Sequence, residues 1–179
     1  SKHSSITMKM VLLGDGGVGK TSLIKQFVSG KFQGQYKATI GVDLFKKRVI
    51  IDNKRINLQV WDLAGQRFFK RYHRHFLGGA LGAFLVFDLT VPPSLNSLNA
   101  WIANTKETTG NINYVLIGNK LDLHEELAVA DEDIQNFLNQ YPNIVDNIKT
   151  SALTGENVNE AFHTIAKVMD EHLNQILHK

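Results

Sequence analysis

Short apolar runs alternate with amphipathic stretches along the whole chain. Four runs are continuous or nearly continuous in apolar residues, namely KMVLL (9–13), INLQVWD (56–62), GAFLVFDL (82–89) and NYVLIGN (113–119). Such runs are typical of strands that are buried on both faces of a sheet. A further strand is expected near 147–150. Residues 43–51 and 56–61 flank the turn-rich stretch IDNKR, which predicts an antiparallel hairpin.

Helical patterns separate these strands at 19–28, 94–108 and 131–140. The clearest helix comes last, where apolar residues recur at helical spacing from Val158 to Ile176. This alternation predicts an α/β fold with a mostly parallel sheet and helices on both faces. Ligands in such folds bind at the carboxyl ends of the strands, so the residues that follow each predicted strand are the candidates for a functional site.

The size and composition of the chain fit one ordinary globular domain. Of its 179 residues, 43% are hydrophobic and 21% are charged, and the net charge of +3 is too small to indicate a nucleic-acid partner. We expect the domain to cover residues 7–177, with residues 1–6 disordered or left over from processing. No apolar run reaches the roughly 20 residues that span a bilayer, and no signal peptide is visible.

The chain contains no cysteine. This absence excludes disulfides, thiolate metal sites and a cysteine nucleophile. It also removes the attachment point for a prenyl or palmitoyl group, so no direct lipid anchor is expected in this chain.

The stretch GDGGVGKT (14–21) has the spacing G-x-x-x-x-G-K-[ST] and lies between a predicted strand and a predicted helix. Its glycines allow backbone N–H groups to approach phosphate oxygens, and the N-terminus of the helix adds a positive dipole. We expect Lys20 to contact the outer phosphates and the Thr21 hydroxyl to bind Mg²⁺. The plain alternative is a glycine-rich turn, and the motif alone indicates only a nucleoside triphosphate.

The stretch NKLD (119–122) follows a predicted strand and indicates which base is bound. The Asp122 carboxylate can accept hydrogen bonds from the ring N–H and the exocyclic amine of guanine, a pair of donors that adenine lacks. Asn119 is expected to bond the base or to tie loops together, and the stem of Lys120 to lie against the ring. The triplet SAL (151–153) could offer backbone contacts to the guanine carbonyl. On its own, NKLD is equally consistent with a solvated turn.

The stretch WDLAG (61–65) places Asp62 at a strand end, where a carboxylate can hold a metal ion through its water. Gly65 would offer its N–H to the terminal phosphate, and Gln66 could position an attacking water. Thr39, within YKATIG (36–41), is a candidate second hydroxyl ligand for Mg²⁺.

In this order and spacing, GDGGVGKT, ATIGVD, WDLAGQ, NKLD and SAL resemble a Ras-superfamily small GTPase over about residues 7–177. The ATIGVD stretch most resembles the Rab branch. The resemblance implies a P-loop NTPase fold with a six-stranded, mostly parallel sheet that contains one antiparallel strand. It also implies five helices, Mg²⁺-dependent hydrolysis of GTP to GDP, and two mobile segments that respond to the nucleotide.

The resemblance assigns roles to individual positions of this sequence. Lys20, Gly65 and Gln66 match the catalytic residues, and Thr21, Thr39 and Asp62 match the metal ligands. Phe32 matches an aromatic residue that packs on the base. Gly16 matches a position where hydrolysis best tolerates a residue without a side chain. The residues expected to contact the nucleotide are Asp15, Gly16, Gly17, Val18, Gly19, Lys20, Thr21, Ser22, Phe32, Tyr36, Thr39, Gly65, Asn119, Lys120, Asp122, Ser151, Ala152 and Leu153.

The resemblance also implies protein partners. Effector, exchange-factor and activating proteins are expected to contact residues 36–47 and 63–77 of a monomer. No residue is an obvious catalytic arginine, so hydrolysis is expected to be slow without a helper protein. The expected location is the cytoplasm, with access to membranes through partners, and no nucleic acid is expected to bind.

The sequence departs from the Rab pattern at several positions. Arg67 stands where a glutamate is usual, and because it would repel Lys20 we hypothesise an altered dependence on exchange factors. That Arg67 acts as a built-in catalytic arginine is a weaker alternative. Leu63 replaces a threonine and Leu153 a lysine. An aromatic trio that faces effectors is matched by Leu44, Trp61 and Phe76, so its first ring is lost.

Two other functional classes would explain parts of the sequence. A GTP-dependent scaffold with little or no hydrolysis would fit Leu63 and Arg67. A basic nucleic-acid module would explain the positive cluster at 67–75, but it would not explain NKLD.

Three polar groups have simpler explanations than a functional site. His73 and His75 would point to different faces of a helix and do not predict a metal pair. Lys46, Lys47, Arg48, Lys54 and Arg55 are expected to form a solvated edge that discourages strand pairing. Asp131, Glu132 and Asp133 are expected to cap a helix and fill its first turn.

Overall fold

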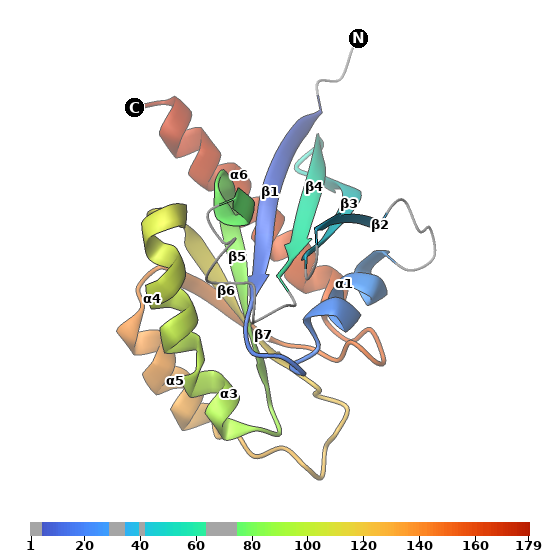
Figure 1. The fold of residues 1–179 in the computed structure, drawn as a ribbon, viewed down its shortest axis with the longest axis vertical. Helices are drawn as coiled ribbons and strands as arrows, with labels where there is room; N and C mark the ends of the chain where they lie inside the picture. Colours follow the sequence, from blue (N-terminus) through green and yellow to red (C-terminus); the bar gives the residue numbers. More distant parts are fainter. Residues whose placement is uncertain (1–4, 29–34, 40–41, 64–74) are drawn as a thin grey trace.

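A seven-stranded sheet in the order β2-β3-β4-β1-β5-β6-β7 forms the centre of the protein (Figure 1). The computed structural model describes residues 5–28, 35–39, 42–63 and 75–179, with the backbone alone for residues 35–39 and 42. The strands are β1 (Ile6–Leu13), β2 (Gln35–Thr39), β3 (Val42–Ile51), β4 (Lys54–Asp62), β5 (Ala80–Asp88), β6 (Asn113–Asn119) and β7 (Ile144–Lys149). The helices are α1 (Lys20–Val28), α3 (Pro92–Asn96), α4 (Leu98–Thr109), α5 (Asp131–Gln140) and α6 (Val158–Leu177).

The pairing of the strands confirms the predicted fold class. Strands β4, β1, β5, β6 and β7 are parallel, and β3 runs antiparallel to β4. The predicted hairpin is present, with Asp43 opposite Asp62 and Ile51 opposite Lys54. All six expected strands are found. The short strand β2 is an addition at the edge of the sheet, where it pairs antiparallel with β3.

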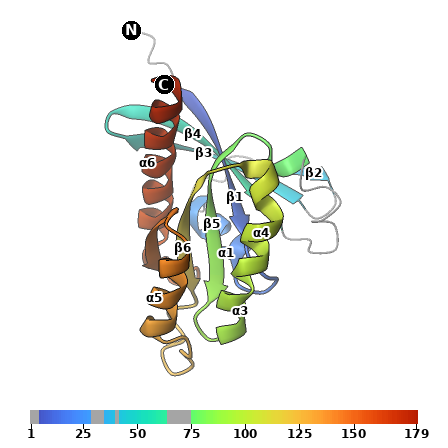
Figure 2. The ribbon, with the colours of Figure 1, turned by 90° about the vertical axis from the view of Figure 1, so that its left-hand side faces the viewer.

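Helices cover both faces of the sheet, and Figure 2 shows α6 and α4 on opposite sides of the strands. Side chains along β1 point alternately to the two faces of the sheet, so the core has two parts. Met8, Met10 and Leu12 pack with α1 and α6 in one apolar cluster. Val11 and Leu13 join α4 and α5 in the other. Each fully buried side chain of this size contributes about 1.5–3 kcal/mol. This double burial explains why the central strands are continuously apolar.

Two helix predictions need correction. The expected helix 94–108 is two helices, because the chain passes from α3 to α4 at Ser97, after Pro92 and Pro93 have started the first turn of α3. Asp131, Glu132 and Asp133 do fill the first turn of α5, but their expected capping role is wrong. Ala130 holds the cap position, and no side chain caps this helix. The Asp131 carboxylate instead pairs with Lys149 at 2.6 Å.

The β3–β4 hairpin is not simply the solvated basic edge that was expected. Lys47 lies over the Phe27 ring, 4.1 Å from its centroid, and donates to the Phe27 carbonyl. Lys54 pairs with the buried Asp170 of α6 at 3.0 Å. Two of the five basic residues therefore tie the hairpin to helices α1 and α6.

The strand ends bring the predicted functional stretches together. The phosphate loop follows β1, Asp62 ends β4, Asp88 ends β5, Asn119 ends β6 and Ser151 lies just beyond β7. Because these five strands are parallel, their carboxyl ends meet at one edge of the sheet. Within the part of the chain that the structure describes, no helix is long and apolar enough to cross a membrane.

Candidate functional site

The loop between β1 and α1 takes a conformation that depends on glycine. Gly14, Gly17 and Gly19 have φ of 145°, 83° and 100°, which L side chains rarely adopt. A Cβ at Gly14 would overlap the carbonyl oxygen of Val86, and a Cβ at Gly19 would overlap the side-chain amide of Asn119. No described atom lies within 4 Å of the Cβ position of Gly16. Among the described residues, the loop is thus packed at Gly14 and Gly19 and uncrowded at Gly16.

Lys20 begins helix α1 and is only 5% exposed. Its Nζ donates to the carbonyl of Gly14 and, at 3.1 Å, to the carbonyl of Asp15. Burial lowers the pKa of Lys20, while the nearby carboxylates of Asp62 and Asp15 oppose that shift. The ammonium is therefore held inside the curve of the loop by backbone oxygens.

A cavity of about 340 Å³ lies beside this loop. The described residues that line it are all among those expected to contact the nucleotide. They are Gly16, Gly17, Gly19, Lys20, Thr21, Ser22 and Lys120. None of the described residues that line it is acidic. A polyanion would meet glycine N–H groups, hydroxyls and two cationic side chains there, which is a suitable environment for a row of phosphates.

Thr21 and Asp62 are neighbours in space although they lie 41 residues apart. The Thr21 hydroxyl donates to Oδ2 of Asp62, a residue with no exposed surface. Its other oxygen, Oδ1, has no hydrogen-bond partner among the described residues. Burial raises the pKa of Asp62, and the hydrogen bond from Thr21 and the charge of Lys20 offset only part of that increase.

This pair fits the expected magnesium site. Mg²⁺ prefers hard oxygen ligands, and an unsatisfied buried carboxylate oxygen beside a hydroxyl is suited to such an ion or to its bound water. The described residues contain no group of three acidic or histidine side chains that could hold a metal alone. A cation here would therefore need further ligands from a phosphate, from water or from Thr39, whose side chain lies outside the described atoms.

Asn119 ties three loops together, which was one of its two expected roles. Its Nδ2 donates to the Val18 carbonyl at 3.0 Å. Its Oδ1 accepts from the Thr150 hydroxyl and from the Ala152 N–H, both at 3.1 Å. The residue is 1% exposed. The phosphate loop and the predicted base-binding loops are thus fastened to a single side chain.

Asp122 and Ser151 also lie together. The Ser151 hydroxyl donates to Oδ1 of Asp122 at 2.7 Å and accepts from the Thr154 N–H at 3.1 Å. This arrangement orients the carboxylate that was expected to read guanine. Leu153, which follows in the same loop, is 79% exposed.

Lys120 is held by Asp88, which is not among the site residues predicted from the sequence. Its Nζ lies 2.9 Å from Oδ2 of Asp88, and its backbone has a positive φ of 71°. Burial alone would raise the pKa of Asp88, but hydrogen bonds from Lys120 and Thr90 outweigh it and lower that pKa. One sequence signal could have identified Asp88, namely an acidic residue at the end of a buried strand. The next predicted strand along the chain is the one that leads into NKLD.

Several predicted residues lie outside the described part of the structure. They are Phe32, Gly65, Gln66, Arg67 and His73, and the side chains of Tyr36 and Thr39. Their roles stay predictions.

The predicted trio at the partner surface is brought together. Leu44 is opposite Trp61 across the hairpin, and the Trp61 and Phe76 rings lie 5.7 Å apart. His75 is exposed, and it belongs to no candidate metal cluster within the described residues.

A larger hollow of about 650 Å³ lies on β1, β3 and β4, away from the carboxyl ends of the parallel strands. It is lined by Thr7, Lys46, Lys47, Arg48, Asn57, Leu58 and Gln59. The described residues that line it include no carboxylate and no glycine-rich loop, so they offer neither the metal site nor the phosphate cradle described above.

Comparison with known proteins agrees with this geometry. The sequence model of the Ras family matches residues 9–171. The chain is 39% identical to the GTP-binding protein ypt3 of Schizosaccharomyces pombe over 158 residues, which cover 88% of this chain and 73% of that protein. It is 38% identical to the Ras-related protein Rab-7a of Paramecium octaurelia over 164 residues, which cover 89% of this chain and 79% of that protein. These similarities confirm the predicted resemblance to the Rab branch.

Proposed function

Because the chain belongs to the Ras family, we propose that it is a GTP-binding switch that hydrolyses GTP to GDP and phosphate with the help of Mg²⁺. The observation that carries this proposal is the fastening of the phosphate loop to the base-binding loops by Asn119. The Asn119 side chain joins the loop expected to bind phosphate to the loop that contains Ser151, whose hydroxyl orients the Asp122 carboxylate.

The phosphates would lie in the cavity beside the loop. The N–H groups around Gly16 and Gly17 would meet phosphate oxygens, and Lys20 would add its charge from the inner side of the loop. Thr21 and Asp62 would hold Mg²⁺, with Thr39 as a further ligand. When bound, the ion neutralises charge that develops on the phosphate oxygens.

The base would be read by Asp122, whose Oδ1 is already oriented by Ser151. The backbone of Ser151, Ala152 and Leu153 lies in the same loop and could face the guanine carbonyl. Asn119 would act by holding these loops rather than by contacting the base alone, because both ends of its amide are already bonded to protein. Phe32 and the stem of Lys120 are proposed to cover the faces of the ring.

Hydrolysis would depend on Gln66, which is proposed to position the attacking water, and on the N–H of Gly65 at the terminal phosphate. Loss of that phosphate would release the segments that contain Thr39 and Gly65, which supports a switch. Single-turnover cleavage of GTP by the wild type and by Gln66→Leu tests this proposal. We expect the variant to be at least 10-fold slower. If both proteins bind GTP but neither cleaves it, the chain is a GTP-dependent scaffold instead.

Partner proteins are proposed to contact residues 36–47 and 63–77, where Leu44, Trp61 and Phe76 form an adjoining set. A role in membrane traffic, with access to membranes through partners, is supported by the relatedness to the Ypt and Rab proteins. Arg67 is proposed to alter the response to exchange factors. In that case Arg67→Glu changes factor-stimulated release of GDP, and an unchanged rate would remove this part of the proposal.

A further inference from the structure

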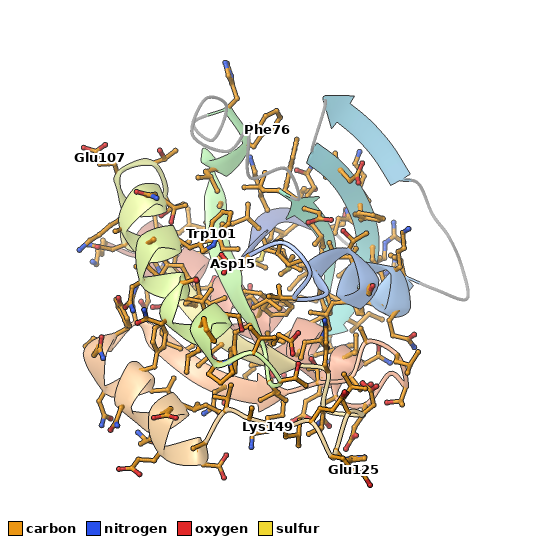
Figure 3. All side chains as sticks on the ribbon, turned by 60° about the horizontal axis from the view of Figure 1, so that its bottom comes forward. Asp15, Phe76, Trp101, Glu107, Glu125 and Lys149 are labelled. Atoms are coloured by element: carbon orange, nitrogen blue, oxygen red, sulfur yellow. The ribbon has the colours of Figure 1, made fainter. Side chains whose placement is uncertain are left out.

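Asp15 is one of the residues expected to contact the nucleotide, and its carboxylate also forms a hydrogen bond to helix α4. The indole Nε1 of Trp101, on α4, donates to Oδ1 of Asp15 at 2.9 Å. Figure 3 shows the two labelled side chains directed toward one another, between α4 and the loop that precedes α1. The residues lie 86 positions apart, so the bond joins two separate segments of the chain.

The position of Trp101 is fixed by the packing of its own helix. The residue is 8% exposed and belongs to the apolar cluster that also contains Leu98 and Ile102 of α4. Its ring therefore has little freedom to follow the loop. A donor on a packed side chain that meets a carboxylate forms a charge-assisted hydrogen bond, which is stronger than a bond between neutral groups.

Asp15 is the one polar side chain in the loop. Residues 14–19 read GDGGVG, so four of the six positions have no side chain and Val18 is apolar and buried. A glycine-rich segment loses more backbone freedom on ordering than other sequences do. The carboxylate of Asp15 is thus the only side-chain acceptor by which the rest of the protein could hold this loop.

The same indole lies near the phosphate-binding lysine. The Lys20 ammonium is 5.7 Å from the centroid of the Trp101 ring, and it donates to the backbone carbonyl of Asp15 at 3.1 Å. The distance to the ring is within the range of a cation–π attraction. Trp101 therefore acts on the loop twice, through the side chain of Asp15 and through the cation that Asp15 binds with its backbone.

We propose that Trp101 is a positioning residue that keeps the phosphate loop in its binding conformation and so slows the release of guanine nucleotide. This inference rests on the proposed function, since it assumes that the loop holds a nucleotide. A loop that is already ordered loses less entropy when the ligand binds. Without the bond from Trp101, the free loop gains alternative conformations, and nucleotide that has begun to leave is recaptured less often.

The test is the release of a fluorescent GDP analogue into excess unlabelled GDP in the presence of Mg²⁺. Trp101→Phe keeps a buried ring and removes Nε1–H, and Asp15→Ala removes the acceptor. Hydrogen bonds to charged groups are worth about 1.5–3 kcal/mol, so we expect each variant to release GDP on the order of 10-fold faster. The double variant should be no faster than either single one, because both changes remove the same bond.

Two further variants distinguish positioning from a loss of general stability. Asp15→Asn keeps an acceptor oxygen but loses the charge, so it should release GDP faster than the wild type and more slowly than Asp15→Ala. Tyr141→Phe removes the hydroxyl that donates to Asn99, another side-chain bond of α4, and should leave the release rate unchanged. If Trp101→Phe does not fold, the contrast between Asp15→Ala and Asp15→Asn still tests the proposal with Trp101 in place.

The outcomes separate this inference from the function on which it rests. A wild-type protein that fails to bind the GDP analogue overturns the proposed function before any variant is compared. A wild-type protein that binds, with Trp101→Phe or Asp15→Ala releasing GDP at the wild-type rate, overturns the role of Trp101 alone. Fully additive effects of the two changes would also overturn it, as would equally fast release by Asp15→Asn and Asp15→Ala.

Discussion

Replacing Asn119 by alanine tests whether this residue serves mainly to hold the loops. The change removes a donor to Val18 and an acceptor for Thr150 and Ala152. At about 1 kcal/mol for each hydrogen bond, the loss amounts to about 3 kcal/mol of unfolding free energy. A whole domain is stabilised by only about 5–15 kcal/mol, so this is a large effect for one polar residue.

A graded set of variants makes the expectation quantitative. Thr150→Val removes one of the three bonds from a fully buried position and should cost about 1 kcal/mol. Asn136→Ala changes an asparagine on the exposed face of α5 and should stay within about 0.5 kcal/mol of the wild type. The expected order of stability is therefore wild type and Asn136→Ala, then Thr150→Val, then Asn119→Ala.

Urea denaturation at several GDP concentrations provides the measurement. Bound nucleotide adds RT ln(1 + [L]/Kd) to the stability, so extrapolation to zero GDP separates the effect on the fold from the effect on affinity. If Asn119→Ala lowers the extrapolated free energy by less than about 1 kcal/mol while GDP affinity collapses, Asn119 acts on the base directly and our explanation is wrong.

Three further predictions concern the same edge of the sheet. Gly19→Ala places a Cβ at a φ of 100° against the Asn119 amide and should cost more than about 2 kcal/mol in urea denaturation. Gly16→Ala places its Cβ where no described atom lies within 4 Å, and it should stay within about 0.5 kcal/mol. Asp122→Asn should lower GTP affinity at least 100-fold by calorimetry and should improve binding of xanthosine triphosphate, because an amide presents one donor and one acceptor where the carboxylate presents two acceptors. The pKa of Asp88 is lowered below its ordinary value of 3.8, so the stabilisation from its bonds is complete above pH 3.8 and is lost as the pH falls through the lower folded value. The stability difference between wild type and Asp88→Asn should accordingly shrink in urea titrations below pH 3.8, and a constant difference would contradict the assigned role of Lys120 and Thr90.

Features encoded by local spacing could be predicted from the sequence. The loop 14–21 needs glycine at fixed positions, and the buried strands need continuous apolar runs, so both the fold class and the order of the motifs follow from the residues. Strand β2 escaped prediction because its pairing depends on its neighbour β3 rather than on its own pattern. The break at Ser97 was hidden because the apolar spacing continues through it.

Contacts between distant segments were the least predictable part of the site. Trp101 sits at an apolar position of a helix, and nothing in the local pattern indicates that its single N–H reaches Asp15. Asp88 looks like the last residue of a strand until β6 places Lys120 beside it. Ala130 gives no capping signal, so the three acids that follow it were wrongly included in the cap.

The bonds of Asn119 also bear on how the domain folds. They span 101 residues toward the phosphate loop and 31 to 33 residues toward the loop after β7. Contacts of such long sequence separation form late, after β1, β6 and β7 have come together in the parallel sheet. Neither half of the chain could assemble this junction alone. A nucleotide that needs both loops would consequently select the completed domain over partly folded forms and would draw nascent chains toward the native state.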